Sequence, residues 1–153
     1  MKPPDPARAI EHRAVRPAEP ADAAALAELM CQLGYETRAD EMEARLRAIL
    51  SNPTYATFVA VRDGTICGMI GASFYHSYEH NDCGGRILAL VVSETVRGHG
   101  IGSALVRAAE KWFIEQKVAR VALNTRFQRE AAHKFYEKLG YTKNGFRFVK
   151  ELK

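Results

Sequence analysis

The sequence is short of cysteine, has no long apolar run and shows no strong excess of either charge. Its three cysteines are odd in number and lack paired spacing, which argues against a disulfide framework or a zinc finger and indicates a reducing compartment. No apolar run approaches the length that spans a bilayer. Residues 1–9 hold three prolines and no apolar segment, so we expect no signal peptide. Together these absences predict a cytoplasmic protein without a membrane partner.

The chain has 153 residues, of which 47% are hydrophobic, enough for one packed core and too few for a second domain. We expect a lead-in over residues 1–11 and a single domain over residues 12–153. The 22 Lys and Arg residues outnumber the 18 Asp and Glu residues, without a run of like charge. This mild excess suits a phosphorylated cofactor, disfavours a polycationic acceptor, and gives no indication of nucleic-acid binding.

The spacing of apolar residues predicts an alternation of strands and helices. Apolar residues recur at helical spacing from Leu26 to Leu33, whereas residues 88–92 form an apolar run typical of a strand covered on both faces. We expect strands at residues 14–16, 55–61, 66–78, 86–93 and 118–124, helices at residues 20–33, 39–50, 100–116 and 129–138, and a final hairpin of residues 141–143 and 146–152. This order, βααβββαβαββ, predicts an α/β (α+β) fold: a mixed, mostly antiparallel sheet of six to seven strands, flanked by about four helices.

The segment Arg97-Gly98-His99-Gly100-Ile101-Gly102 lies between an expected buried strand and an expected helix. Glycines let the backbone approach a ligand closely, and the unpaired N–H groups of a helix's first turn attract anions. A pyrophosphate fits this description, with the Arg97 guanidinium beside it. A flexible turn at a helix entry explains the glycines equally well when they are taken alone. A dinucleotide-binding loop would need glycine at Ser103 and a Walker loop would need Gly-Lys-Ser/Thr, so both of those match poorly.

This loop, preceded by Leu90-Val91-Val92, resembles the acetyl-CoA-binding motif of the GNAT superfamily of N-acetyltransferases. A downstream stretch, Ala132-x-x-Phe135-Tyr136-x-x-x-Gly140-Tyr141, is similar to the second signature of that family. The two stretches follow in the usual order and at the usual separation, and the resemblance covers almost the whole chain. It implies the GNAT fold, acetyl-CoA as co-substrate, and direct transfer of acetyl to a primary amine of a small molecule.

The resemblance also implies which residues hold the cofactor. The strand at 86–93 would splay from the next one, and the N–H of Val91 or Val92 would polarise the thioester carbonyl. Many relatives carry Asn where this chain has Arg129, so Asn124 is an alternative contact for the pantetheine arm. The expected cofactor-binding residues are Leu90, Val91, Val92, Arg97, Gly98, His99, Gly100, Ile101, Gly102, Ser103, Asn124, Arg129, Ala132, Phe135 and Tyr136.

By the same resemblance, Tyr136 would protonate the departing CoA thiolate as a general acid. Its spacing alone fits a core aromatic beside Phe135 better. The attacking amine must first lose a proton, because a free ammonium has a pKa of about 10. Glu79 or His80, acting through a water, is the expected base. A merely solvated loop is the simpler interpretation of either residue taken singly.

The acceptor site of this family forms from two loops, which here supply four expected substrate-binding residues: Tyr35, Arg38, His76 and Tyr78. Several stretches are also similar to aminoalkylphosphonate N-acetyltransferases, and Arg38, Arg126 and Arg147 would then hold an anionic acceptor. Members of that group can use a divalent metal. We nevertheless expect no metal, because the spacing of His76, His80, Asp82 and Cys83 fits no familiar site.

Two other functions stay open. A protein or peptide amine would need an open groove where a small amine needs a closed pocket. A non-catalytic module of the same fold would bind acetyl-CoA without turnover. Many family members are homodimers, so the resemblance leaves that state open as well.

Overall fold

The structure, a computed structural model, describes residues 13–125 and 130–152. These residues fall into two compact units that meet in the sequence between Ala122 and Leu123. The first unit holds a sheet with its covering helices, and the second holds the last helix.

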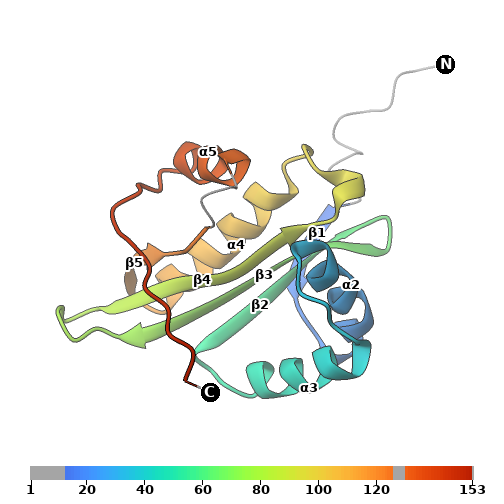
Figure 1. The fold of residues 1–153 in the computed structure, drawn as a ribbon, viewed down its shortest axis with the longest axis horizontal. Helices are drawn as coiled ribbons and strands as arrows, with labels where there is room; N and C mark the ends of the chain where they lie inside the picture. Colours follow the sequence, from blue (N-terminus) through green and yellow to red (C-terminus); the bar gives the residue numbers. More distant parts are fainter. Residues whose placement is uncertain (1–12, 126–129, 153) are drawn as a thin grey trace. The chain divides into compact units, whose positions relative to one another are not determined.

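The first unit contains a five-stranded sheet in the order β1-β2-β3-β4-β5 (Figure 1). The strands are β1 (Arg13–Pro17), β2 (Tyr55–Arg62), β3 (Thr65–His76), β4 (Cys83–Val92) and β5 (Val118–Ala122). Strands β1 to β4 pair antiparallel, whereas β5 runs parallel to β4. The predicted mixed, mostly antiparallel sheet is confirmed. The predicted number of six to seven strands is wrong, because the described residues form five.

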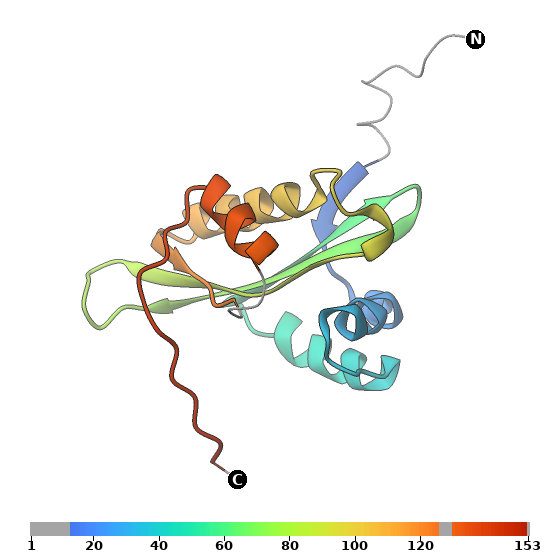
Figure 2. The same cartoon turned by 45° about the horizontal axis from the view of Figure 1, so that its top comes forward.

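Helices cover both faces of this sheet. Helices α2 (Ala23–Leu33) and α3 (Ala39–Leu50) lie on one face, and α4 (Ile101–Glu115) lies on the other (Figure 2). The α2–α3 face buries Val59 and Met69 of the sheet with Leu26 and Leu46 of the helices. The α4 side contributes the fully buried Phe113, among others. The central strands are therefore fixed from both sides, which gives the residues along them defined positions.

The start of α2 is tied to β1 by an ion pair. A 3-10 turn, η1 (Pro20–Asp22), leads into the helix, and the Asp22 carboxylate accepts a hydrogen bond from the Glu19 N–H at 2.8 Å. The Arg16 guanidinium donates to both oxygens of the same carboxylate, at 2.8 and 2.9 Å. That two-pronged hydrogen bond lowers the pKa of Asp22, although burial of the carboxylate acts in the opposite direction.

The second unit contains α5 (Glu130–Lys138). Gly140, the predicted C-cap, follows it with a positive φ of 92° and donates its N–H to the Glu137 carbonyl at 3.0 Å. The predicted final hairpin of residues 141–143 and 146–152 is not formed, since residues 141–152 carry no strand. Phe146 and Phe148 are 87% and 93% exposed. The apolar alternation and the Asn144-Gly145 turn signal are present, but a first strand of three residues is too short to support a hairpin by itself. This accounts for the two strands that are missing from the expected sheet.

Candidate active site

Strand β4 leaves half of one edge unpaired within the first unit. Parallel pairing with β5 runs from Cys83 to Arg86, where Arg86 lies opposite Ala122, the last residue of β5. Residues 87–92 continue to pair with β3 on the other side. Inside this unit, no described strand faces residues 87–92 on the β5 side. The backbone groups that point to that side can therefore bind a ligand.

The ladder with β3 determines which amides these are. The Ser93 N–H donates to the Cys67 carbonyl at 2.7 Å, and alternate residues of an antiparallel strand point the same way. Val91 therefore points its N–H toward β3, whereas Leu90 and Val92 point theirs to the unpaired side. The Arg97 side chain agrees with this, because its Nε donates to the Val92 carbonyl at 3.2 Å.

A β-bulge lies in the middle of the same strand. Gly71 of β3 pairs with Ala89, and the next residue, Ala72, pairs with Ile87, so Leu88 has no partner in the register. The Leu88 side chain is 52% exposed, where the sequence predicts a strand covered on both faces. Bulges bend a strand and open its edge, and this one lies where β4 and β5 part.

The glycine loop follows the unpaired edge directly. After the turn η2 (Glu94–Val96), Gly98 and Gly100 take positive φ angles of 84° and 77°, which side chains other than glycine rarely adopt. A Cβ at either glycine would meet no described atom within 4 Å, so the space beside both is open. Gly100 caps α4, whose first turn has no side-chain cap and no acidic residue. The N–H groups of a helix's first turn and the helix dipole attract anions, and this geometry is compatible with the predicted diphosphate site.

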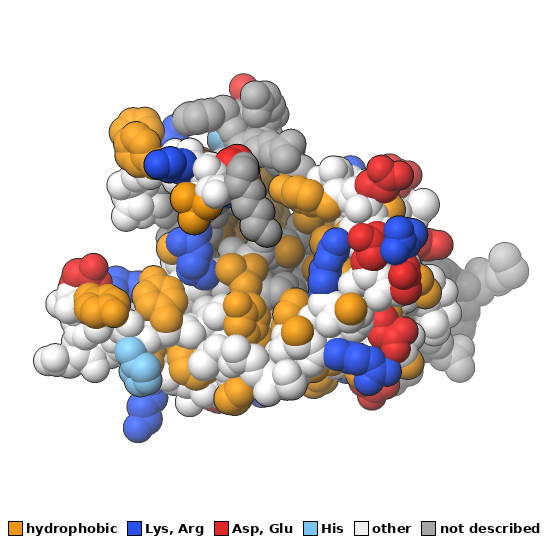
Figure 3. All heavy atoms as spheres, turned by 60° about the horizontal axis from the view of Figure 1, so that its bottom comes forward, with side chains coloured by type: hydrophobic (Ala, Val, Ile, Leu, Met, Phe, Trp, Pro, Cys, Tyr) orange, Lys and Arg blue, Asp and Glu red, His pale blue; other side chains and the backbone are white. Residues whose placement is uncertain are grey.

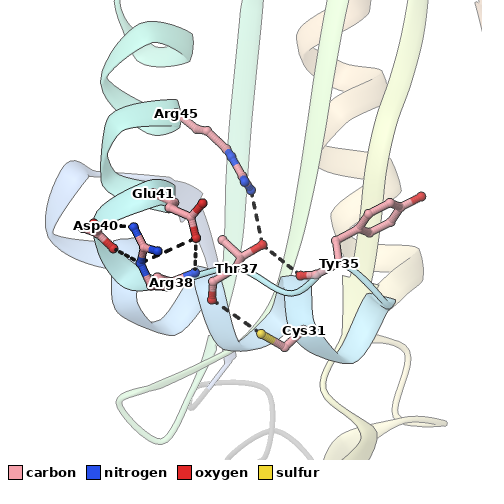
Figure 4. Close-up of polar contacts among 7 residues, drawn as sticks. All are labelled: Cys31, Tyr35, Thr37, Arg38, Asp40, Glu41 and Arg45. Carbon is pink, nitrogen blue, oxygen red and sulfur yellow. Dashed lines mark hydrogen bonds and ion pairs between the residues drawn. The ribbon is translucent and has the colours of Figure 1, made fainter. Parts of the chain in front are cut away.

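The loop between α2 and α3 is held by buried polar contacts (Figure 4). Thr37, 7% exposed, donates from its hydroxyl to the Tyr35 carbonyl at 2.8 Å and accepts from Arg45 at 3.3 Å. The Cys31 thiol contacts the Thr37 carbonyl at 3.5 Å. The Tyr35 ring points away from this cluster and is 53% exposed. Arg38 instead donates to Asp40 at 3.0 Å, which lowers the pKa of that carboxylate.

Residues 23–141 match the acetyltransferase (GNAT) family. The chain belongs to this family. It is 33% identical over 121 residues to the aminoalkylphosphonate N-acetyltransferase of Salmonella typhimurium, which spans 79% of this chain and 76% of that protein. It is 29% identical over 131 residues to the aminoglycoside N(6′)-acetyltransferase type 1 of Stenotrophomonas maltophilia, spanning 83% and 84%.

Solved structures agree. A GNAT family acetyltransferase from Staphylococcus aureus superposes with a TM-score of 0.79 at 25% identity, over 92% of this chain and 99% of that one. The chain is an N-acetyltransferase with the GNAT fold, and the identification made from the two motifs is confirmed. Members of the family use acetyl-CoA as the acetyl donor.

The acetyltransferase carries its predicted base residues at an exposed hairpin tip between β3 and β4. The Ser77 hydroxyl accepts hydrogen bonds from the N–H groups of Glu79 and His80 and donates to the Glu79 carboxylate at 3.1 Å. The tip comprises residues 77–82, between the end of β3 and Cys83 at the start of β4. Cys83 lies about 17 Å along β4 from Leu88 at the usual rise per residue. Glu79 and His80 are therefore far along the hairpin from the bulge, and their role as the base stays a prediction.

The other predicted acceptor residues of this hairpin share its exposure. Tyr78 is fully exposed, and the His76 imidazole lies 3.8 Å from the Cys83 thiol. Asp82 pairs with Arg120 of β5. In the described parts of the chain, no three His, Cys, Asp or Glu side chains come close enough to share a metal ion.

In the second unit, Tyr136 lies among aromatic rings. Its ring centroid is 5.1 Å from that of Phe135 and 5.8 Å from that of Tyr141, both edge-on. Ala132 is half-buried on the same helix, and Asn124 is exposed at the start of this unit. Arg126 and Arg129 fall outside the described residues. Arg147 lies in the exposed stretch after α5.

A shallow cavity of about 480 Å³ lies between the beginnings of α2 and α3. It is lined by small residues and by Asp40, Glu43 and Arg47. The Arg47 and Glu43 side chains pair with each other at 2.8 Å, and Asp40 pairs with Arg38, so no free polar group faces a ligand. No helix within the described ranges could span a membrane.

Sequence reasoning passed over three residues on the sheet: Thr57, Gly71 and Arg86. The only local signal was the charge of Arg86, an arginine within an otherwise uncharged strand. Their significance depends on the register between β2, β3 and β4, which the sequence does not display.

Proposed function

We propose that this chain transfers the acetyl group of acetyl-CoA directly to the primary amine of a small molecule. The observation that carries this proposal is the continuity of two features: the unpaired edge of β4 leads through the short turn η2 into the open glycine loop at α4. The thioester of acetyl-CoA would lie along the edge of β4, and its diphosphate would lie at the glycine loop.

In this proposal the diphosphate binds at the N-terminus of α4. The backbone N–H groups of residues 98–103 face the anion, and the glycines at 98 and 100 leave room for it. The Arg97 side chain adds positive charge beside them. His99 and Ser103 belong to the same segment and are also proposed to bind the cofactor.

The thioester carbonyl would receive its hydrogen bond from the Val92 or Leu90 N–H. The ladder directs these two amides to the unpaired side. Of the two donors expected from the sequence, Val92 is therefore kept and Leu90 takes the place of Val91. A backbone N–H held in a paired strand is already oriented before the oxyanion forms, and losing one such donor typically costs about 100- to 1000-fold in rate.

Tyr136 remains the proposed general acid for the CoA thiolate, and Phe135 and Ala132 the proposed pantetheine contacts, on the strength of the family motif. Tyr35 is the proposed acceptor contact from the α2–α3 loop, because its ring is exposed and its backbone is fixed by Thr37. Arg38 is occupied by Asp40 and is a weaker candidate.

The direct test is release of CoA from acetyl-CoA by the purified protein over a panel of amines: aminoalkylphosphonates, amino acids, polyamines, aminoglycosides and an N-terminal peptide. We expect turnover with one or more small amines and none with the peptide. Turnover with the peptide alone would identify a protein acetyltransferase. Binding of acetyl-CoA without turnover on any amine would leave only the non-catalytic alternative.

A further inference from the structure

The face of the sheet that carries α2 and α3 continues beyond these helices, and the register places three polar side chains in one row there. Tyr55 of β2 lies opposite Ser73 of β3, and Ser73 lies opposite Arg86 of β4. Residues opposite one another share a face, and neighbouring strands are about 4.8 Å apart. The phenol, the hydroxyl and the guanidinium therefore stand side by side.

Packing identifies the face. Met69 packs with the α2–α3 core, so Gly71 and Ser73 lie on that same face by alternation. Across β4, a Cβ at Gly85 would meet the Phe113 ring of α4 at 2.6 Å, which places Gly85 on the opposite face. Its neighbour Arg86 therefore lies on the α2–α3 face, beside Ser73.

Next to this row the face is open. A Cβ at Gly71 would meet no atom of the described residues within 4 Å, although the residue lies in the middle of a paired strand. Its neighbour on β2 is Thr57, a polar side chain that is 7% exposed. Figure 3 shows this side of the molecule, where hydrophobic side chains gather in the middle of the view. On the β4 side, the open space at Gly71 borders the bulge at Leu88.

The central strands contribute a positive charge to this face and no negative charge. Strands β2, β3 and β4 contain no Asp or Glu. Arg86 is half-buried, and among the described residues no side chain or carbonyl pairs with its guanidinium. A guanidinium presents a planar fork of N–H donors that matches the oxygens of a phosphonate or carboxylate. An anion from outside the chain would supply such a partner.

We infer that Arg86, with Ser73 and Tyr55 beside it, binds an acidic group of the acceptor, so that the enzyme prefers amines carrying a phosphonate or carboxylate. This inference rests on the proposed function, since it names the acceptor class of the same site. Leu88 is two residues, roughly 7 Å, along β4 from Arg86. A short aminoalkyl acid would span that distance across Gly71, with its acidic end at Arg86 and its amine at the bulge.

The test compares two acceptors that differ in the acidic group, 2-aminoethylphosphonate and ethanolamine. We expect wild-type protein to prefer the phosphonate by kcat/KM. Arg86→Gln should raise the KM for the phosphonate by about 10- to 100-fold with little change in kcat, which is the loss expected for a charge-assisted bond. The kcat/KM for ethanolamine should change less than about threefold, and Arg86→Lys should restore part of the preference.

Two controls separate this effect from others. Arg62 lies at the end of β2 opposite to Tyr55. Arg62→Gln removes one positive charge there and should leave the preference for the phosphonate intact. Gly71→Val fills the open space at this position and should raise the KM for both acceptors without changing CoA affinity. An unchanged KM for the phosphonate in Arg86→Gln, or an equal loss for both acceptors, would overturn the inference.

Binding of ethylphosphonate, which has no amine to react, distinguishes failure of this inference from failure of the proposed function. Titration calorimetry in the presence of CoA should detect binding to wild-type protein and a loss of at least about tenfold in Arg86→Gln. Equal binding to both proteins rejects the subsite even if the enzyme acetylates amines. Binding that depends on Arg86 without turnover on any amine keeps the subsite and rejects the enzymatic proposal.

Discussion

At the scale of single residues, the proposed chemistry needs two protons in fixed places: one on a β4 amide, and one on the Tyr136 phenol. The amide is fixed by the ladder with β3, because Ser93 and Val91 point one way and Val92 the other. The phenol is carried by a ring that packs edge-on against Phe135 and Tyr141. Phenylalanine would keep these ring contacts and remove the phenolic proton donor.

Tyr136→Phe should therefore lower kcat by about 100- to 10,000-fold, the usual range for loss of a general acid, while the affinity for CoA changes less than about twofold. Steady-state turnover and CoA titration measure the two quantities. Tyr141→Phe is the matched control, since it removes a hydroxyl from the neighbouring ring and should retain activity. A Tyr136→Phe variant with wild-type kcat would remove the tyrosine from the mechanism.

At the scale of elements, the position of the α2–α3 pair on the sheet depends on the contact between β1 and the start of α2. Asp22 joins Arg16 of β1 to the Glu19 N–H before the helix, and its side chain is 8% exposed. The pKa of Asp22 is lowered from its ordinary 3.8 chiefly by the Arg16 hydrogen bond. Because the folded-state value is the lower one, the carboxylate stabilises the fold above about pH 4 and loses this effect as pH falls further.

Asp22→Asn should lower the free energy of unfolding by about 1–3 kcal/mol at pH 7, through loss of charge-assisted hydrogen bonds at a buried position. The gap to wild type should begin to narrow below about pH 4, where the Asp22 carboxylate of the unfolded chain becomes protonated, and should close as pH falls through the lower pKa of the folded state. Thermal unfolding followed by circular dichroism at several pH values measures both effects. Asp40→Asn, which removes a 72% exposed carboxylate from its pair with Arg38, should change Tm little. A gap that stays constant down to pH 3 would contradict this account.

At the scale of the whole molecule, local sequence patterns predicted the elements whose information is local. The helix at 39–50 was found to the residue, because an apolar stripe and the Asn52-Pro53 stop frame it. The glycine loop was found for the same reason: its residue types are the ones that a close backbone approach requires. The final hairpin was wrong because a strong turn signal was given a partner strand of only three residues.

Local sequence patterns do not reveal the features that shape the proposed acceptor site. The bulge at Leu88 is a mismatch of register between two strands, and the row of Tyr55, Ser73 and Arg86 joins residues up to 31 positions apart in the chain. Gly71 looks like any glycine in a strand until the space above it is known. Sequence reasoning instead chose the polar loop residues Glu79 and His80, which the structure holds at an exposed tip.

The central claim is that the open backbone at the start of α4 binds the diphosphate of CoA, and titration calorimetry with CoA tests it most directly. Gly100→Val places a branched side chain in the proposed diphosphate space, and Gly64→Val is a matched control, because Gly64 has the same φ of +77° and equally open surroundings at the distant β2–β3 turn. The account predicts binding by wild type and by Gly64→Val, and none by Gly100→Val with its circular dichroism spectrum intact. Equal CoA affinity in all three proteins would contradict it.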